Sequence, residues 1–178
     1  LYFEAEDGTH GFELWKSDGT SGGTVMVKDI YPGSEDSDVD LFTVMGDTLY
    51  FIANDGNGGW TNVELWRTDG TEDGTYMVKD IRDGYYGSSP GPLQYGIYSM
   101  AIMDDNLYFH ANDGVHGVEL WKSDGTEAGT VMVKDIRSGY SSSSSSPAQL
   151  TAVGNTLYFR ANDGTHGAEL WKSDGTEA

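Results

Sequence analysis

The sequence predicts an all-β fold of tandem four-stranded antiparallel sheets, similar to the blades of a β-propeller. Three observations support this prediction. A unit of about fifty residues repeats along the chain. Each unit contains short runs rich in aromatic, Leu and β-branched residues, which are typical of strands. These runs are separated by tight-turn residues, and the chain has 25 glycines and 12% aromatic residues. The segment Leu-Tyr-Phe marks the repeat, beginning at Leu1, Leu49, Leu107 and Leu157.

One unit carries four strand-like runs, exemplified by residues 150–153, 156–161, 118–123 and 130–136. The connections between them are short enough for antiparallel neighbours in a meander. Successive side chains of a strand point to opposite faces, and here both faces are apolar. Stacking each sheet between its neighbours covers both faces, as in a propeller. An open β solenoid or a linear stack of sheets is the alternative.

The units divide the chain into 1–30 (the last three strands of a unit), 31–81, 82–136 and 137–178 (the first three strands). This gives about three and a half blades, whereas closed propellers have roughly four to eight. We therefore expect the chain, which begins at Leu1 without a Met, to be a mature or excised part of a longer array. Alternatively, copies complete one another, two copies supplying seven blades or many forming a fibre.

The charge excludes some functions. The chain has 29 acidic and 10 basic residues, a formal net charge of −19. Nucleic-acid binding depends on Lys and Arg that neutralise phosphates, so we expect no nucleic-acid partner. No run approaches the ~20 apolar residues of a membrane span. The chain has no Cys, and therefore neither disulfides nor thiolate metal sites. An acidic surface attracts cations.

The segments Glu13-Leu14-Trp15-Lys16-Ser17-Asp18-Gly19-Thr20, 64–71, 119–126 and 169–176 resemble the ELW-x-x-DGT repeat family of bacterial proteins. The flanking Leu-Tyr-Phe-x-Ala-Asn-Asp-Gly and Gly-Thr-x-Met-Val-Lys-Asp-Ile blocks fit the same pattern. The resemblance implies a propeller-like fold and an exported or surface-displayed location. It implies no catalytic residues.

Asp-Gly pairs mark two loops of each unit and are typical of tight turns, in which Asp accepts local N–H groups. The same oxygens could bind calcium, which takes six to eight oxygen ligands, and Glu13, Glu64, Glu119 and Glu169 could add to them. No stretch matches the EF-hand spacing. Both interpretations stay open. The calcium candidates are Asp7, Asp55, Asp113 and Asp163 in one loop, and Asp18, Asp69, Asp124 and Asp174 in the other.

Aromatic and histidine side chains recur in register. Trp15, Trp66, Trp121 and Trp171 are expected to pack between blades, or else to stack against sugars at a rim. Trp60 stands alone in an irregular loop and is the better candidate for glycan contact. We expect His10, His116 and His166 to hydrogen-bond within their loops, because zinc needs three or four clustered ligands. His110 has no counterpart in the other units.

Charged and serine-rich segments lie outside the apolar runs. The pairs Lys28-Asp29, Lys79-Asp80 and Lys134-Asp135 are expected on edge strands, where charge discourages edge-to-edge pairing. Ion pairing with the next unit is the alternative. Residues 141–146 are six serines, which predict a flexible connector or, in an exported protein, O-glycosylation sites.

No P-loop, no H-E-x-x-H segment and no Cys nucleophile is found, and the repeated carboxylates do not form one asymmetric group of the kind that catalysis needs. We therefore predict a non-enzymatic extracellular or cell-surface scaffold for adhesion, a surface layer or fibre assembly, with stabilisation by calcium left open as above. Its expected partners are other copies of the chain or flanking repeats, with glycans as an alternative partner. A carbohydrate-binding module and the propeller portion of a larger secreted hydrolase are the alternatives.

Overall fold

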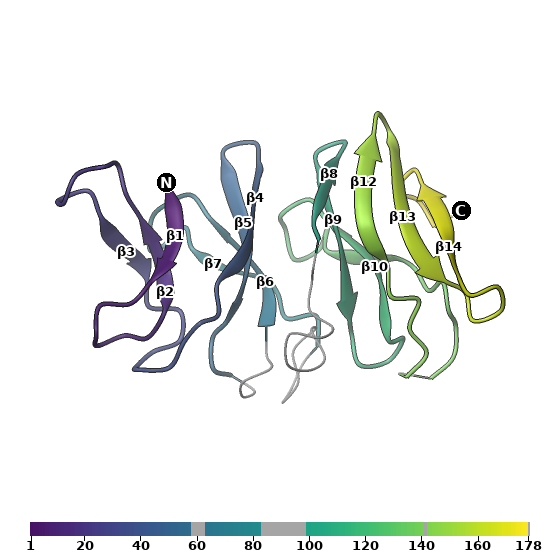
Figure 1. Ribbon diagram of the computed structural model, residues 1–178, viewed down its shortest axis with the longest axis horizontal. Coiled ribbons are helices and arrows are strands. Elements are labelled where there is room, and N and C mark those ends of the chain that lie inside the picture. The colour runs from purple at the N-terminus through teal and green to yellow at the C-terminus, as the bar shows by residue number, and fades with distance from the viewer. Residues whose placement is uncertain (58–62, 83–98, 141, 178) are drawn as a thin grey trace.

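The computed structural model describes residues 1–57, 63–82, 99–140 and 142–177. Within these ranges the chain forms fourteen strands and no helix, so no helix is available there to span a membrane. The strands make four separate antiparallel sheets, which follow one another in chain order (Figure 1). The predicted all-β fold of propeller-like sheets is therefore confirmed. We call the four sheets units one to four.

The two inner sheets are complete and have four strands in meander order. In both, the first two strands are joined by a tight two-residue turn. In unit three this turn is Asp104-Asp105, and both residues have positive φ, as a type I′ hairpin requires. Unit two contains β4 (Asp40–Met45), β5 (Thr48–Asn54), β6 (Val63–Thr68) and β7 (Tyr76–Lys79), and unit three contains β8 (Ala101–Met103), β9 (Asn106–Asn112), β10 (Val118–Ser123) and β11 (Val131–Lys134).

The two terminal sheets have three strands each and lie at opposite ends of the row (Figure 1). Because each terminal sheet stands separately, two copies of the chain would bring together eight sheets, not seven complete blades. Unit one contains β1 (Tyr2–Ala5), β2 (Glu13–Lys16) and β3 (Val25–Lys28), and unit four contains β12 (Ala148–Val153), β13 (Thr156–Asn162) and β14 (Ala168–Ser173).

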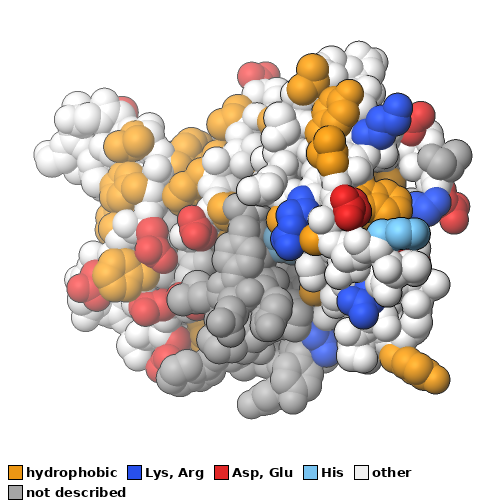
Figure 2. Space-filling model, turned by 45° about the vertical axis from the view of Figure 1, so that its right-hand side comes forward, with side chains coloured by type: hydrophobic (Ala, Val, Ile, Leu, Met, Phe, Trp, Pro, Cys, Tyr) orange, Lys and Arg blue, Asp and Glu red, His pale blue; other side chains and the backbone are white. Residues whose placement is uncertain are grey.

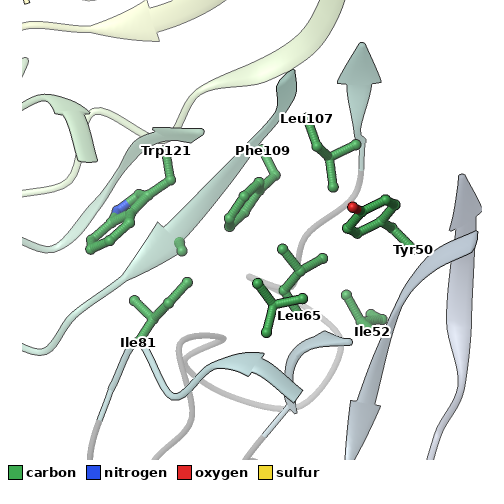
Figure 3. Packing of buried hydrophobic residues seen from close by; sticks show 9 residues of the cluster. Tyr50, Ile52, Leu65, Ile81, Leu107, Phe109 and Trp121 are labelled. Atoms are coloured by element: carbon green, nitrogen blue, oxygen red, sulfur yellow. The ribbon is translucent and has the colours of Figure 1, made fainter. Parts of the chain in front are cut away.

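Each sheet has two apolar faces that differ in composition. The face toward the following unit presents a Tyr, a Leu and a Val, which in unit two are Tyr50, Leu65 and Val78. The face toward the preceding unit presents Leu, Phe and Trp. Figure 3 shows this contact between units two and three: Phe109 and Trp121, on the face of unit three toward the preceding unit, lie against the face of unit two toward the following unit. The other two junctions pair the same residue types, so one contact is used three times.

Polar contacts accompany this packing. A cation on β2, β6 and β10 donates a hydrogen bond to a carbonyl oxygen of the next unit: Lys16 to Gly70 (2.7 Å), Arg67 to Gly125 (3.0 Å) and Lys122 to Gly175 (2.8 Å). A Tyr hydroxyl from the preceding strand, β1, β5 or β9, lies over the same glycine. A methyl group added to Gly125 would lie 2.1 Å from the Tyr50 hydroxyl. This position therefore has no room for a side chain.

The lysines of the Lys-Asp pairs also bind the next unit. β3, β7 and β11 are edge strands of their sheets, as expected. Lys28 and Lys79, however, donate to the carbonyl oxygens of Thr75 and Thr130, each at 2.8 Å, and Lys134 to that of Glu177 at 3.0 Å. Their acceptors are main-chain oxygens rather than the carboxylates of an ion pair. These lysines thus fasten neighbouring sheets together.

Lys122→Met is expected to lower the free energy of unfolding by about 1–2 kcal/mol, because the Gly175 carbonyl loses a charged donor. The matched control is Lys172→Met, which alters the same repeat position on β14, after which the described residues include no further sheet. We expect it to change stability by less than about 0.5 kcal/mol. Denaturant unfolding of dilute, singly dispersed chains measures both. If the two variants lose the same free energy of unfolding, the hydrogen bond from Lys122 to Gly175 does not stabilise the junction.

Candidate functional site

The loop that follows β2, β6, β10 and β14 has the same Asp–Thr bonding in every unit. In unit one, Asp18 Oδ1 accepts from the backbone N–H and the hydroxyl of Thr20, at 2.9 and 2.7 Å. The Thr20 hydroxyl in turn accepts from the N–H of Gly23. The hydrogen bonds to Asp18 lower the pKa of its carboxyl group, and the bond from the Thr20 hydroxyl has the largest effect. Asp69, Asp124 and Asp174 make the same two bonds to Thr71, Thr126 and Thr176.

Glycine in this loop makes room for the aspartate. A methyl group on Gly23 would lie 2.0 Å from Asp18 Oδ1, whereas the adjacent Gly22 has no atom within 4 Å of that position. Gly74 and Gly129 have the same close approach to Asp69 and Asp124. The Asp-Gly-Thr-x-x-Gly motif is therefore explained by packing within the loop.

The loop that precedes β2, β10 and β14 joins Asp to His. Asp7 Oδ1 accepts from the N–H groups of Thr9 and His10, and Oδ2 lies 2.8 Å from His10 Nδ1. These bonds lower the pKa of Asp7 to about 2, and the bond from the backbone N–H of His10 has the largest effect. The hydrogen bond to the Asp7 carboxylate in turn raises the pKa of His10. Asp113–His116 and Asp163–His166 repeat the pair at 2.6 and 2.7 Å. The histidines thus hydrogen-bond within their loops, as predicted.

Unit two departs from this pattern without losing the turn. Asp55 Oδ1 accepts from the N–H of Asn57, and the Asn57 amide donates to Oδ2 at 2.9 Å, in place of a histidine. The preceding Asn54 accepts from the N–H of Gly56, as Asn112 and Asn162 do from their glycines. The loop therefore relies on Asx-type bonding, and the imidazole is replaceable.

The eight candidate aspartates for calcium are thus distributed over eight loops, each bonded within its own turn. In the described ranges, no group of three or more His, Cys, Asp or Glu side chains comes together to hold a metal ion. Calcium binding stays a prediction for these loops.

The buried glutamates of the Glu-Leu-Trp segments have a different role from the one expected. Glu13, Glu64 and Glu119 are fully buried, so they are not available as loop ligands. Glu13 accepts from the N–H groups of Ile30 and Tyr31, which follow β3. Glu64 and Glu119 accept from the N–H groups of Ile81 and Ile136 in the same way. Each carboxylate therefore fixes the chain as it leaves one sheet for the next.

The serine run is also different from the prediction over its described part, 142–146. Ser145 is buried, and it donates to Glu119 through both its N–H (2.9 Å) and its hydroxyl (2.5 Å). Ser144 accepts from the N–H of Val118. The buried Ser37 occupies the equivalent place beside Glu13. This part of the run is a bonded connection rather than a flexible linker, and Ser145 is not accessible for glycosylation.

The repeated tryptophans lie mainly between sheets. Trp66 and Trp121 are buried against the preceding units, as predicted, so their rings are not available for stacking on sugars. Trp15 and Trp171 are half-buried in the terminal sheets. Trp60, the glycan-contact candidate, lies outside the described residues. His110 is buried in β9, at the position that Ile52 occupies in β5.

Comparisons with known proteins bear on the fold. No known family model matches the chain, and no curated protein matches it. The chain is similar to the crystal structure of puromycin hydrolase, with a TM-score of 0.59 and 19% identity over 94% of this chain and 24% of that one. It also matches the computationally designed Ika8 protein, with a TM-score of 0.42, 18% identity, and 99% and 46% coverage. The first likeness supports the propeller-like arrangement of sheets. The chain spans about a quarter of puromycin hydrolase.

Glu13→Gln is expected to flatten the dependence of stability on pH. Burial raises the pKa of Glu13 from 4.5 to about 7, although N–H and hydroxyl donors oppose it. A carboxyl group that binds its proton more tightly when folded stabilises the protein fully below 4.5 and loses that contribution as pH rises through about 7. The melting temperature of the natural chain should therefore fall over this window.

The control for this measurement is Glu169→Gln, which changes the same repeat position where the side chain is exposed. It should leave the pH dependence as in the natural chain. If Glu13→Gln and Glu169→Gln give the same curve, then the buried carboxyl group does not titrate with folding.

Proposed function

We propose that the chain is a non-enzymatic scaffold outside the cell or at its surface, serving in adhesion, a surface layer or an assembled fibre. The observation that carries this proposal is the repeated use of polar side chains for structure. The Asp-Gly loops, the buried glutamates and the junction lysines have the same kind of partner in successive units.

Catalysis needs one asymmetric group of residues, with pKa values set apart by different surroundings. Here the shifts recur with the repeat instead. The pKa of Asp7, Asp113 and Asp163 is lowered in each Asp–His loop, and the paired histidine pKa is raised each time. Such uniformity favours a structural role or many equal binding sites.

We expect the purified chain to give no hits on a glycan array and no turnover with ester, amide and glycoside substrates. In intact cells of the source organism, external protease should release peptides of the protein before any cytoplasmic marker. The control on the array is Trp60→Ala. A glycan hit weakened by that substitution would replace the scaffold with a lectin role, substrate turnover with a hydrolase role, and protection from protease would contradict the location.

Calcium stabilisation is part of the same proposal. A net charge of −19 destabilises the compact chain through self-repulsion, which bound cations relieve. We expect the melting temperature to be higher in millimolar calcium than in excess chelator. Magnesium at the same concentration is the control, since it screens charge equally but prefers rigid octahedral sites. Equal melting temperatures in calcium and chelator would contradict binding.

A further inference from the structure

We propose that the chain cuts its own backbone between Ser144 and Ser145, with the Ser145 hydroxyl as nucleophile and the Glu119 carboxylate as general base. The reaction is a single self-processing event that acts on no external substrate. It therefore goes beyond the scaffold role and does not depend on it. Three contacts around one peptide bond carry the inference.

The nucleophile is held against a base in a site that excludes water. Ser145 is 1% exposed and Glu119 is fully buried. The Ser145 hydroxyl donates to Glu119 Oε2 at 2.5 Å, which is within reach for proton transfer. Burial raises the pKa of Glu119, although hydroxyl and N–H donors oppose it. A carboxylate with a raised pKa is a better proton acceptor, as a general base needs to be.

The same carboxylate contacts the nitrogen that leaves. Glu119 Oε1 accepts from the N–H of Ser145 at 2.9 Å. One side chain thus meets both the atom that must lose a proton and the atom that must gain one. On the other side of the bond, Arg137 Nη1 donates to the carbonyl oxygen of Ser144 at 3.5 Å. A guanidinium at this place stabilises the negative charge that develops on the oxygen during attack.

The chemistry balances with water as the only co-reactant. Glu119 takes the hydroxyl proton while Ser145 Oγ forms a bond to the carbonyl carbon of Ser144. The proton then passes from Glu119 to the nitrogen as the C–N bond breaks, which leaves an ester at Oγ and a free amine. Water hydrolyses the ester, which gives a carboxylate on Ser144 and restores the Ser145 hydroxyl.

Water has a route to the ester from the side of Ser144. Ser142 is exposed and Ser143 and Ser144 are half-buried, whereas Ser145 is buried. Units three and four form the side of the molecule that Figure 2 turns forward, and Lys, Arg and His side chains lie at its surface there. The nucleophile is therefore shielded while the acyl group lies toward a polar, hydrated surface.

The corresponding place in unit one lacks this arrangement. Ser37 is buried beside Glu13, and its hydroxyl helps to lower the pKa of that residue. The N–H and the hydroxyl of Ser37, however, both donate to the carbonyl oxygen of Phe12, at 2.9 Å. Tyr31 stands in the sequence where unit three has Arg137. A connection between sheets thus forms without the Ser145 contacts, which make one asymmetric group of the kind that catalysis needs.

Mass spectrometry of the purified chain under denaturing conditions measures the reaction. Incubation at neutral pH should yield fragments 1–144 and 145–178, whose masses sum to that of the intact chain plus one water. The native particle should keep its size, because the apolar cluster between units three and four holds the fragments together. Hydroxylamine, which attacks esters faster than amides, should speed the cut and leave a hydroxamate on Ser144.

Variants assign the roles. Ser145→Ala and Glu119→Gln should each abolish the cut, and Ser145→Cys should retain it, since a thiol can replace the hydroxyl as nucleophile. Arg137→Met should slow the cut at least about tenfold. The matched control is Ser37→Ala, which should be cut at the natural rate.

Two of these results keep the test independent of any loss of folding, since Ser145→Cys and Arg137→Met leave the buried glutamate in place. The proposal is overturned if the natural chain stays intact, if Ser145→Ala is cut at the same bond, or if Ser145→Cys is not cut. An intact chain would overturn self-cleavage alone and leave the scaffold proposal as it stands.

Discussion

The contact between neighbouring sheets is the interaction on which the rest of this structure depends. A sheet that is apolar on both faces cannot bury them alone, and a short sheet has little core of its own. The chain solves this by making the two faces complementary. Tyr50, Leu65 and Val78 of one unit fill the space against Leu107, Phe109 and Trp121 of the next. Stability is therefore shared between neighbours, as in other repeat proteins.

This contact also explains why the Glu-Leu-Trp segment recurs. In unit three, Leu120 packs toward the following unit and Trp121 toward the preceding one. Glu119 holds the departing chain, and Lys122 reaches the next loop. The Ser123 hydroxyl pairs with that of Thr130 across the loop, at 2.7 Å. Every residue of the segment thus has a partner that the repeat itself supplies, so copies must change together or stay alike.

The sequence was sufficient for the strands, their order and the local turns, because these depend on alternation and on neighbours a few residues away. The junction contacts could not be predicted in the same way. Lys28 binds an oxygen 47 residues further along, and Ser145 binds a glutamate 26 residues before it. From charge and serine content alone, we predicted edge strands protected by charge and a flexible serine linker. The hydrogen-bond acceptors of these lysines and serines lie far away in the sequence, so their structural roles could not be predicted from it. Ser37 and Ser145 lie at the same distance before the first strand of the next unit, and this regularity was the signal in the sequence for a shared structural role. It was hard to recognise because the connectors that contain these serines differ in length.

The residue before Ala in each Leu-Tyr-Phe-x-Ala strand is where the units differ within a junction. It is Glu4, Ile52, His110 and Arg160 in turn, on the face that meets the next unit. Burial, and then Asp38 and Asp36, raise the pKa of Glu4, whereas Ile52 belongs to an apolar cluster. Identical units can pair in the wrong order, a common failure of repeat proteins. Ile52 and His110 are buried at this position, whereas Glu4 and Arg160 are exposed. A charged side chain placed in the apolar cluster around Ile52 would lose its hydration, which costs free energy. This difference opposes the exchange of one unit for another, while the common apolar contact stabilises every junction.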